Sequence, residues 1–105
     1  MIARHWKGIA KPELADAYEQ HLLSETFPHL LQIKGFIKAS ILKRRLAAGI
    51  EFLIITQWDS LSSIKAFAGE DIEIAVIPQK VREMMVHYDD KAFHYEVAKE
   101  FDREN

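Results

Sequence analysis

The side chains best suited to acid–base chemistry in this chain of 105 residues are its five histidines. They are His5, His21, His29, His87 and His94. The ordinary pKa of an imidazole lies near neutrality, so a histidine can accept a proton from a phenol at physiological pH. None of the five falls in a His-Glu-x-x-His or similar ligand spacing, and no pair of carboxylates lies at a metal-like interval from them. The spacing therefore predicts no metal site.

Aromatic side chains are the second set with chemical potential. They could line a cleft for a flat ligand by stacking on it and excluding water, and the candidates are Trp6, Tyr18, Phe27, Trp58 and Phe67. The simpler interpretation is that such residues belong to the hydrophobic core, and it is the favoured one for Trp58 and Phe67. Arg4 and Arg45 are candidates to hold an anionic group of a ligand, although most arginines are solvated or paired at a surface.

Composition narrows the class of partner and the compartment. The chain has 14 Lys and Arg against 16 Asp and Glu, a net charge of -2 and a pI near 6.2, which predicts neither nucleic acid nor an anionic membrane as a partner. The absence of cysteine excludes disulfides, thiolate catalysis and cysteine-based zinc sites. The first five residues contain no apolar leader, and no run is long enough to span a membrane. We therefore expect a cytoplasmic protein.

The first half of the chain predicts a strand, a helix and a hairpin. Residues 2–10 have the character of a strand, and Pro12 then opens a helix, because proline suits the first helical position. Leu14, Tyr18 and Leu22 form an apolar stripe along that helix, which Pro28 should end or bend near Phe27. Two strands follow, at 36–46 and 50–58, around a short connection.

The second half predicts a capped helix and a last strand. Asp59 and Ser60 supply side-chain oxygens that can cap a helix over 61–68, and Gly69 is well placed to end it. Residues 70–87 should contain one or two short helical turns interrupted by Pro78, and residues 90–99 a final strand. The polar residues 100–105 form a tail.

The order βαββαβ predicts an α+β domain of the ferredoxin-like type with a four-stranded antiparallel sheet. In the third strand Phe52 and Ile54 face one way while Leu53 and Ile55 face the other, so both faces are apolar. Helices can cover only one of them, and a second copy of the sheet is the simplest cover for the other, which predicts a homodimer. The alternative is a central strand with one modestly exposed apolar face.

Four segments together resemble the antibiotic biosynthesis monooxygenase domain family. They are residues 1–6, 52–61 (Phe-Leu-Ile-Ile-Thr-Gln-Trp-Asp-Ser-Leu), 64–71 (Ile-Lys-Ala-Phe-Ala-Gly-Glu-Asp) and 94–97 (His-Tyr-Glu-Val). The resemblance spans nearly the whole chain and implies one domain over 1–99, followed by the tail. It also implies a dimeric α/β barrel with a pocket in each subunit between the helices and the sheet.

The resemblance implies a function as well. Characterised members include monooxygenases that act on phenols or quinols without a cofactor, and we expect this chemistry, with no cofactor or metal, on a small aromatic substrate. His5 lies where relatives place a polar pocket group and is the expected base, with the ordinary alternative of a hydrogen-bonded histidine in a sheet. The expected substrate-binding residues are Trp6, Tyr18, Phe27, Trp58, Phe67 and His94.

Two other functions remain open at this stage. A non-catalytic dimeric module that binds a small molecule, or serves a stress response, would use the same pocket. Heme-degrading relatives have an axial histidine at a place that corresponds to Val76 and Ile77 here, and neither residue can ligate iron. Heme degradation is therefore the less favoured alternative.

Overall fold

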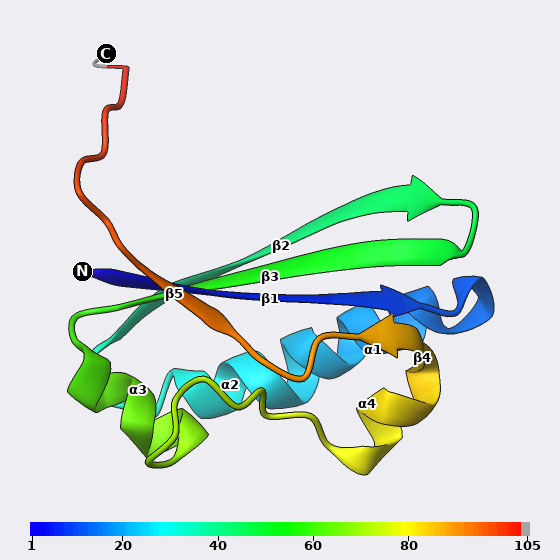
Figure 1. Cartoon of the computed structure of the whole chain (residues 1–105), viewed down its shortest axis with the longest axis horizontal. Coiled ribbons are helices and arrows are strands. Elements are labelled where there is room, and N and C mark those ends of the chain that lie inside the picture. Colours follow the sequence, from blue (N-terminus) through cyan, green and yellow to red (C-terminus); the bar gives the residue numbers. More distant parts are fainter. Residues whose placement is uncertain (104–105) are drawn as a thin grey trace.

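The computed structural model describes residues 1–103, so the last two residues of the predicted tail lie outside the described part. One antiparallel sheet carries all the helices on one face (Figure 1). Its three long strands are β1 (Ile2–Ala10), β3 (Gly49–Trp58) and β2 (Phe36–Leu46), and the sheet order is β2-β3-β1-β4 with β5 also pairing with β1. This is the ferredoxin-like order, and the α+β prediction is confirmed.

The outer edge of the sheet differs from the prediction of four strands. Two short strands, β4 (Met85–Tyr88) and β5 (Phe93–Glu96), pair with opposite ends of β1, so the sheet has five strands. The residues between β4 and β5 form no continuous ladder with β1. The amide of Asp89 donates to the carbonyl of Lys7 on β1, whereas the amide of Ala92 donates to the carbonyl of Glu73. The single strand expected over 90–99 is therefore shorter and preceded by a strand that the sequence did not reveal.

The first helical region runs from Pro12 to Leu30 without a break. It consists of a 3₁₀ turn η1 (Pro12–Leu14), α1 (Ala15–His21), a π-helical turn η2 (Leu22–Thr26) and α2 (Phe27–Leu30). Pro28 was expected to end or bend the helix near Phe27; the helix does not end there but continues to Leu30 after a π-helical turn. In the widened turn the amide of Phe27 donates to the carbonyl of Leu22, five residues back, and this change of hydrogen-bond register accommodates the proline.

The predicted helix over 61–68 is confirmed as α3 (Leu61–Ala68), with its expected cap. The hydroxyl of Ser60 accepts from the amide of Ser63 at 3.3 Å, and Gly69 ends the helix with a positive φ of 88°. The remaining helix, α4 (Gln79–Met84), follows Pro78 and is one of the short helical turns expected there.

The core lies between the sheet and the helices in two adjoining clusters. The larger one joins α1 to the sheet through Tyr18, Leu22, Phe52 and Ile54, and the smaller one gathers Trp58, Ile64 and Leu30 at the other end. The side chains of β3 that face the helices are buried from Phe52 to Trp58, whereas Leu53 and Ile55 on the other face are only half-buried.

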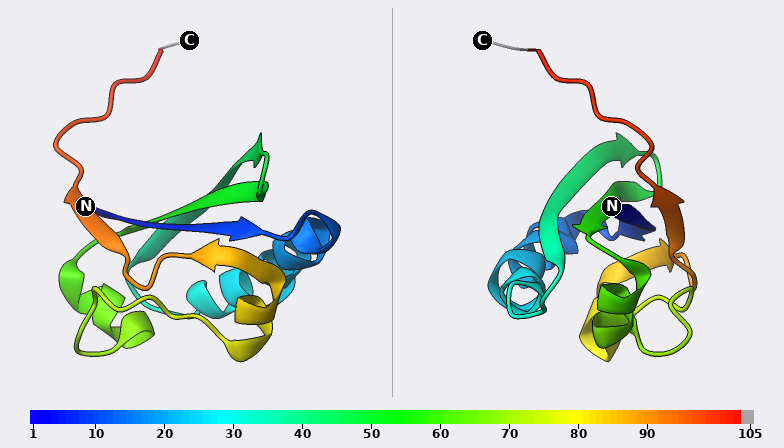
Figure 2. Two further views of the ribbon diagram at one scale, coloured as in Figure 1. Left: turned by 45° about the vertical axis from the view of Figure 1, so that its right-hand side comes forward. Right: turned by 90° about the vertical axis from the view of Figure 1, so that its left-hand side faces the viewer.

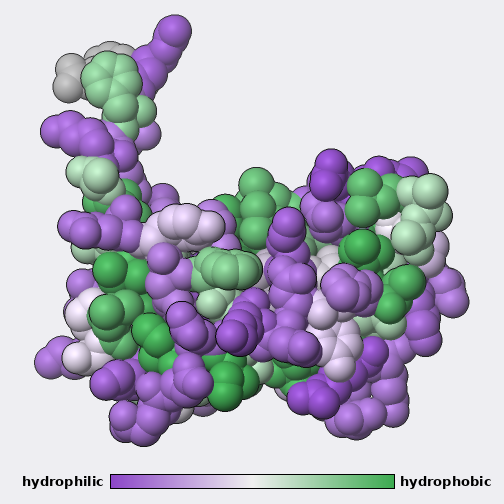
Figure 3. All heavy atoms as spheres, viewed as in Figure 1, coloured by the Kyte–Doolittle hydropathy of each residue, from purple (hydrophilic) through white to green (hydrophobic). Residues whose placement is uncertain are grey.

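The face of the sheet opposite the helices has no covering layer in the described chain, as the two turned views show (Figure 2). Phe93 and Tyr95 of β5 are 56% and 54% exposed. After β5 the chain rises away from the body of the molecule, and Phe101 is almost fully exposed (Figures 2 and 3). In Figure 3 apolar and polar side chains lie side by side, with apolar ones gathered between α3 and the start of this C-terminal segment.

No helix within residues 1–103 is long and apolar enough to cross a membrane.

Candidate functional site

A small cavity lies between the helices and the sheet, where the sequence resemblance placed a pocket. Its floor comes from β1 and β3, one side comes from the helical region 18–30, and the other comes from residues 75–78 and α4. The cavity has a volume of about 80 Å³ and is partly open to solvent. Residues 75–78 are held in place partly because the amide of Ala75 donates to the carbonyl of Asp90.

Four of the predicted aromatic residues line this cavity: Trp6, Tyr18, Phe27 and Phe67. The indole nitrogen of Trp6 donates to the carbonyl of Asp89 at 2.7 Å, which fixes the ring at the gap between β4 and β5. Tyr18 meets Phe52 edge-on, with ring centroids 4.8 Å apart, and burial raises the pKa of its hydroxyl. The aromatic walls are therefore held by contacts on their far sides.

Arg4 brings a positive charge to the cavity wall. The residue is 5% exposed, and its guanidinium donates to the carbonyls of Ile72 and Ile74 and to Nε2 of His94, the last at 2.8 Å. Its centre lies 5.8 Å from the ring centroid of Phe67. Within residues 1–103 no carboxylate forms an ion pair with Arg4. Burial lowers its pKa to about 10, which leaves the group charged at neutral pH. A buried cation without a counterion favours an anionic ligand.

His21 also lines the cavity, and the sequence analysis assigned it no role there. The residue is 7% exposed, and its Nδ1 lies 3.2 Å from a carboxylate oxygen of Glu25. A signal for this position did exist. His21 is three residues after Tyr18 and therefore lies on the same helical face as the apolar stripe. The side chains of Thr26 and Thr56 add hydroxyls to the wall and were also missed.

Two predicted binding residues lie next to the cavity without lining it. Trp58 is fully buried and stacks on Phe67 with ring centroids 6.1 Å apart, while its indole donates to the hydroxyl of Thr56 at 2.9 Å. His94 accepts from Arg4, so it orients the guanidinium. Both residues support cavity-lining side chains from behind.

The structure separates His5 from the cavity. Adjacent residues of a strand point to opposite faces, so His5 lies on the open face of the sheet while Arg4 and Trp6 face the helices. There it borders a second hollow, of about 260 Å³ and partly open to solvent, with Phe93 and Tyr95, and its ring centroid is 4.9 Å from that of Tyr95. Burial lowers the pKa of His5. Its catalytic role stays a prediction that this position does not support.

Within residues 1–103 no group of three or more histidine, aspartate or glutamate side chains is arranged to hold a metal ion. The cavity itself offers one imidazole and one guanidinium, with Glu25 behind the imidazole. This set suits proton transfer and anion binding.

Comparison with solved structures reveals relatives of the same fold. A proposed antibiotic biosynthesis monooxygenase from Bacillus cereus aligns with 100% of this chain and 98% of its own, with a TM-score of 0.70 and 15% identity. The monooxygenase ActVA-Orf6 of Streptomyces coelicolor, solved with nanaomycin D, has a TM-score of 0.64 and 13% identity over 98% of this chain and 92% of its own. The heme-degrader MhuD from Mycobacterium tuberculosis, solved with two hemes in its active site, has a TM-score of 0.60 and 14% identity over 97% of this chain and 100% of its own.

Sequence comparison adds no closer relative, because no protein-family model and no curated protein matches the chain. Identities of 13–15% to these structures establish the fold alone. The resemblance read from the sequence is confirmed at that level: this chain has the fold of the antibiotic biosynthesis monooxygenase structures.

Proposed function

We propose that the protein oxidises a small phenol or quinol with molecular oxygen in the cavity between helices and sheet, without a metal or an organic cofactor. The observation that carries the proposal is the buried guanidinium of Arg4, which has no carboxylate partner within residues 1–103 and faces an aromatic-walled cavity. A phenolate or quinolate presents to such a cavity both a flat ring and a negative oxygen. Arg4 would stabilise that oxygen, while Trp6 and Phe67 contact the ring.

The chemistry makes limited demands on the protein. A deprotonated quinol can give electrons to oxygen directly, so the protein must supply a dry cavity, a proton acceptor and a positive group near the oxyanion. For a benzene-1,4-diol the balance is quinol plus O₂ giving hydroxyquinone plus water. The quinol supplies all the electrons, one oxygen atom enters the ring, and the other leaves as water. No outside reductant is needed.

The size of the cavity supports a substrate with one ring. Its volume of about 80 Å³ is well below the roughly 300–1,000 Å³ of pockets that hold drug-sized ligands. A polycyclic phenol or a heme would require residues 75–78 to move outward. Val76 and Ile77 in that wall present only hydrocarbon, so heme degradation gains no support from them. That ActVA-Orf6 was solved with the ligand nanaomycin D supports a small organic molecule as the ligand of a protein with this fold.

A homodimer joined through the open faces of the two sheets belongs to the same proposal. The half-exposed rings of Phe93 and Tyr95 and the half-buried Leu53 and Ile55 support a second copy as the cover for this face. The C-terminal segment, which stands clear of its own subunit, supports an additional contact with that copy. The cytoplasm stays the proposed compartment, on the sequence argument alone.

The test is a thermal-shift screen followed by an oxygen-electrode assay. Methylhydroquinone, anthrone and hemin would be the probes, and the proteins would be wild type, Arg4→Met and Arg45→Met, the last changing an exposed arginine outside the cavity. With wild type and Arg45→Met, we expect methylhydroquinone to raise the Tm and to be consumed together with oxygen. With Arg4→Met, we expect neither the rise in Tm nor the consumption of oxygen. His5→Gln should keep wild-type turnover. A loss of about two to four orders of magnitude in that variant would instead make His5 the base.

The remaining outcomes separate the rival functions. A raised Tm with no oxygen consumption by any quinol would contradict the enzyme proposal and favour a non-catalytic binding module. A Soret band on adding hemin that persists until a reductant is supplied would favour heme breakdown. No shift with any probe would contradict the cavity as a ligand site.

A further inference from the structure

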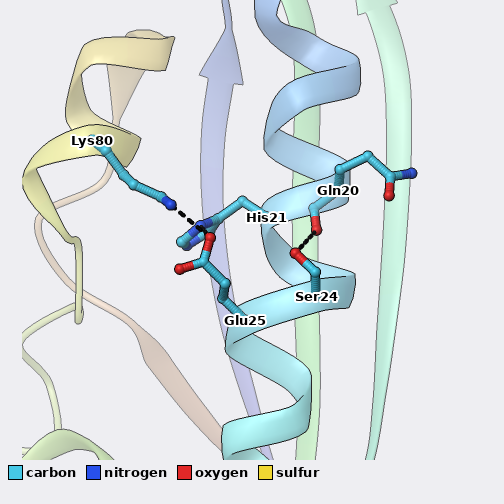
Figure 4. A network of polar contacts seen from close by, with 5 residues as sticks. All are labelled: Gln20, His21, Ser24, Glu25 and Lys80. Atoms are coloured by element: carbon cyan, nitrogen blue, oxygen red, sulfur yellow. Dashed lines mark hydrogen bonds and ion pairs between the residues drawn. The ribbon is translucent and has the colours of Figure 1, made fainter.

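His21 belongs to a chain of polar contacts that ends at the cavity. It is the last residue of α1, and Glu25 lies one turn later in the π-helical turn η2. Nδ1 of His21 is 3.2 Å from Oε2 of Glu25, and Nζ of Lys80, on α4, donates to the same oxygen at 2.6 Å (Figure 4). Two packed elements therefore hold the carboxylate behind the imidazole.

The π-helical turn itself contributes to this arrangement. Such turns widen the helix and shift the side chains that follow them, and they occur frequently at functional sites. The hydroxyl of Ser24 donates to the carbonyl of Gln20 at 2.7 Å on the outer side of the turn (Figure 4). The register change thus occurs where His21 and Glu25 meet.

The contacts determine which nitrogen of His21 carries the proton. The hydrogen bond from Lys80, followed by the one from His21, lowers the pKa of Glu25, so this carboxylate is ionised at neutral pH and can only accept. Nδ1 must then carry the hydrogen, which leaves the lone pair on Nε2. Within residues 1–103 no protein atom forms a hydrogen bond with Nε2 of His21. Since His21 lines the cavity, this nitrogen can accept a proton from a ligand there.

Taking oxidation of a phenol in this cavity as the proposed function, we propose that His21 is its proton acceptor and that Glu25, held by Lys80, is the positioning residue. In the step, the O–H bond of the phenol breaks, an N–H bond forms at Nε2, and the electron pair stays on the phenolate oxygen. The carboxylate of Glu25 faces the resulting imidazolium and stabilises it, as carboxylates do behind catalytic histidines.

The other groups around His21 favour this assignment. Arg4 on β1 is the remaining charged side chain lining the cavity, and it stabilises the phenolate without accepting a proton. Tyr18, on α1, stays neutral because burial raises the pKa of its hydroxyl. Among the other histidines, His29 is exposed on α2 and His5 lies on the opposite face of the sheet. His21 is the residue that combines access to the cavity with an oriented lone pair.

The experiment uses a probe that is not oxidised, so its result does not depend on turnover. The probe is 4-nitrophenol, whose yellow phenolate band reports ionisation of the bound molecule, at about one pH unit below its own pKa. We expect wild type to bind the probe mainly as phenolate and His21→Gln to bind it with an ionised fraction lower by about threefold or more. His29→Gln is the matched control and should behave like wild type.

Nitrogen-15 NMR of the wild-type histidines tests the orientation without any variant or ligand. We expect His21 to carry a hydrogen on Nδ1, facing Glu25, with Nε2 free of hydrogen. Glu25→Gln retains an acceptor and should keep this tautomer, whereas Glu25→Ala should shift the hydrogen toward Nε2 and reduce ionisation of the bound probe. Because Glu25 is exposed, both variants should fold.

The outcomes distinguish this inference from the proposed function. Equal ionisation of bound 4-nitrophenol by wild type and His21→Gln overturns His21 as the acceptor and leaves the phenol cavity standing. A hydrogen on Nε2 and none on Nδ1 in wild type also overturns the proposed orientation of His21 by Glu25. Failure of wild type to bind 4-nitrophenol contradicts the phenol cavity and, with it, this role of His21.

Discussion

Under the proposed function, Arg4 selects the charge of the ligand, because it carries a positive charge among apolar walls. Benzoate, a one-ring carboxylate, should bind beside it. At about a hundred times its Kd, such a ligand should raise the free energy of unfolding of wild type by about 2.7 kcal/mol through mass action. Arg4→Met, which keeps the length of the side chain and removes its charge, should show no such gain. Urea denaturation with and without benzoate measures both.

The control for this prediction is an arginine of the same chain that is exposed to solvent and lies outside the cavity. Arg45 of β2 is exposed, so Arg45→Met should keep the full stabilisation by benzoate. Equal stabilisation of Arg4→Met and wild type would show that the anion binds elsewhere.

His94 makes the stability of the fold sensitive to pH. Burial, followed by the charge of Arg4, lowers the pKa of this imidazole below its ordinary 6.5. As the pH falls from about 6.5, the unfolded chain therefore takes up a proton that the folded chain refuses. Unfolding becomes easier, so the contribution of His94 to stability is present above pH 6.5 and is lost below it. His94→Gln keeps an acceptor for Arg4 and removes the titration.

We therefore expect the free energy of unfolding of wild type to fall between about pH 7.5 and pH 5.5, and that of His94→Gln to fall less. Denaturation curves at the two pH values measure the difference. His29→Gln, which changes an exposed histidine of α2, should keep the wild-type dependence. An unchanged slope in His94→Gln would refute the assignment.

At the scale of elements, strand β1 can carry Trp6 over the cavity because Gly8 has no side chain. A Cβ built at Gly8 would lie 2.6 Å from the outer carbon of the Trp6 ring, closer than real contacts allow. Gly8→Ala should therefore push the indole off the strand and weaken its bond to the carbonyl of Asp89. The cost should be about 1–3 kcal/mol in the free energy of unfolding. Tryptophan fluorescence and urea denaturation measure the two effects.

The control for this substitution uses another small residue. Ala48→Gly in the exposed hairpin changes a residue of similar size away from the cavity and should leave the fluorescence unchanged. If Gly8→Ala kept the fluorescence spectrum and the free energy of unfolding of wild type, the Trp6 ring would not pack against the backbone of Gly8.

Helices and strands also differ in how well their ends can be predicted from residues that are close together in the sequence. The cap of α3 involves Asp59, Ser60 and Ser63, all within five residues, so the sequence predicted it correctly. The gap between β4 and β5 depends on bonds from residues 89–92 to β1 and to residues 73–75, which no local pattern reveals. The same holds for Pro28, whose helix continues because the turn before it widens.

At the scale of the whole molecule, the open face of the sheet predicts self-association. Tyr95→Lys places a charge on this face and should convert a dimer into a monomer of 12.2 kDa. Sedimentation velocity measures the mass. Leu31→Lys is the matched control, since Leu31 is 74% exposed at the end of α2, away from this face. A wild-type monomer, or a dimer that survives Tyr95→Lys, would contradict the proposed interface.

The sequence by itself determined the strands at 2–10, 36–46 and 50–58, the capped helix over 61–68 and the α+β order. Alternation, helical spacing and caps depend on residues close together along the chain. It also identified four of the aromatic residues that line the cavity. The sequence named both Arg4 and Arg45 as candidates to hold an anionic group, and only the tertiary structure decided that Arg4 lines the cavity while Arg45 does not. Arg4 meets carbonyls 68 and 70 residues away, and His21 lines the cavity together with residues 75–78 and Val81 of α4, more than 50 residues further along the chain. Such contacts arise from packing between distant segments, and only the folded chain brings those segments together.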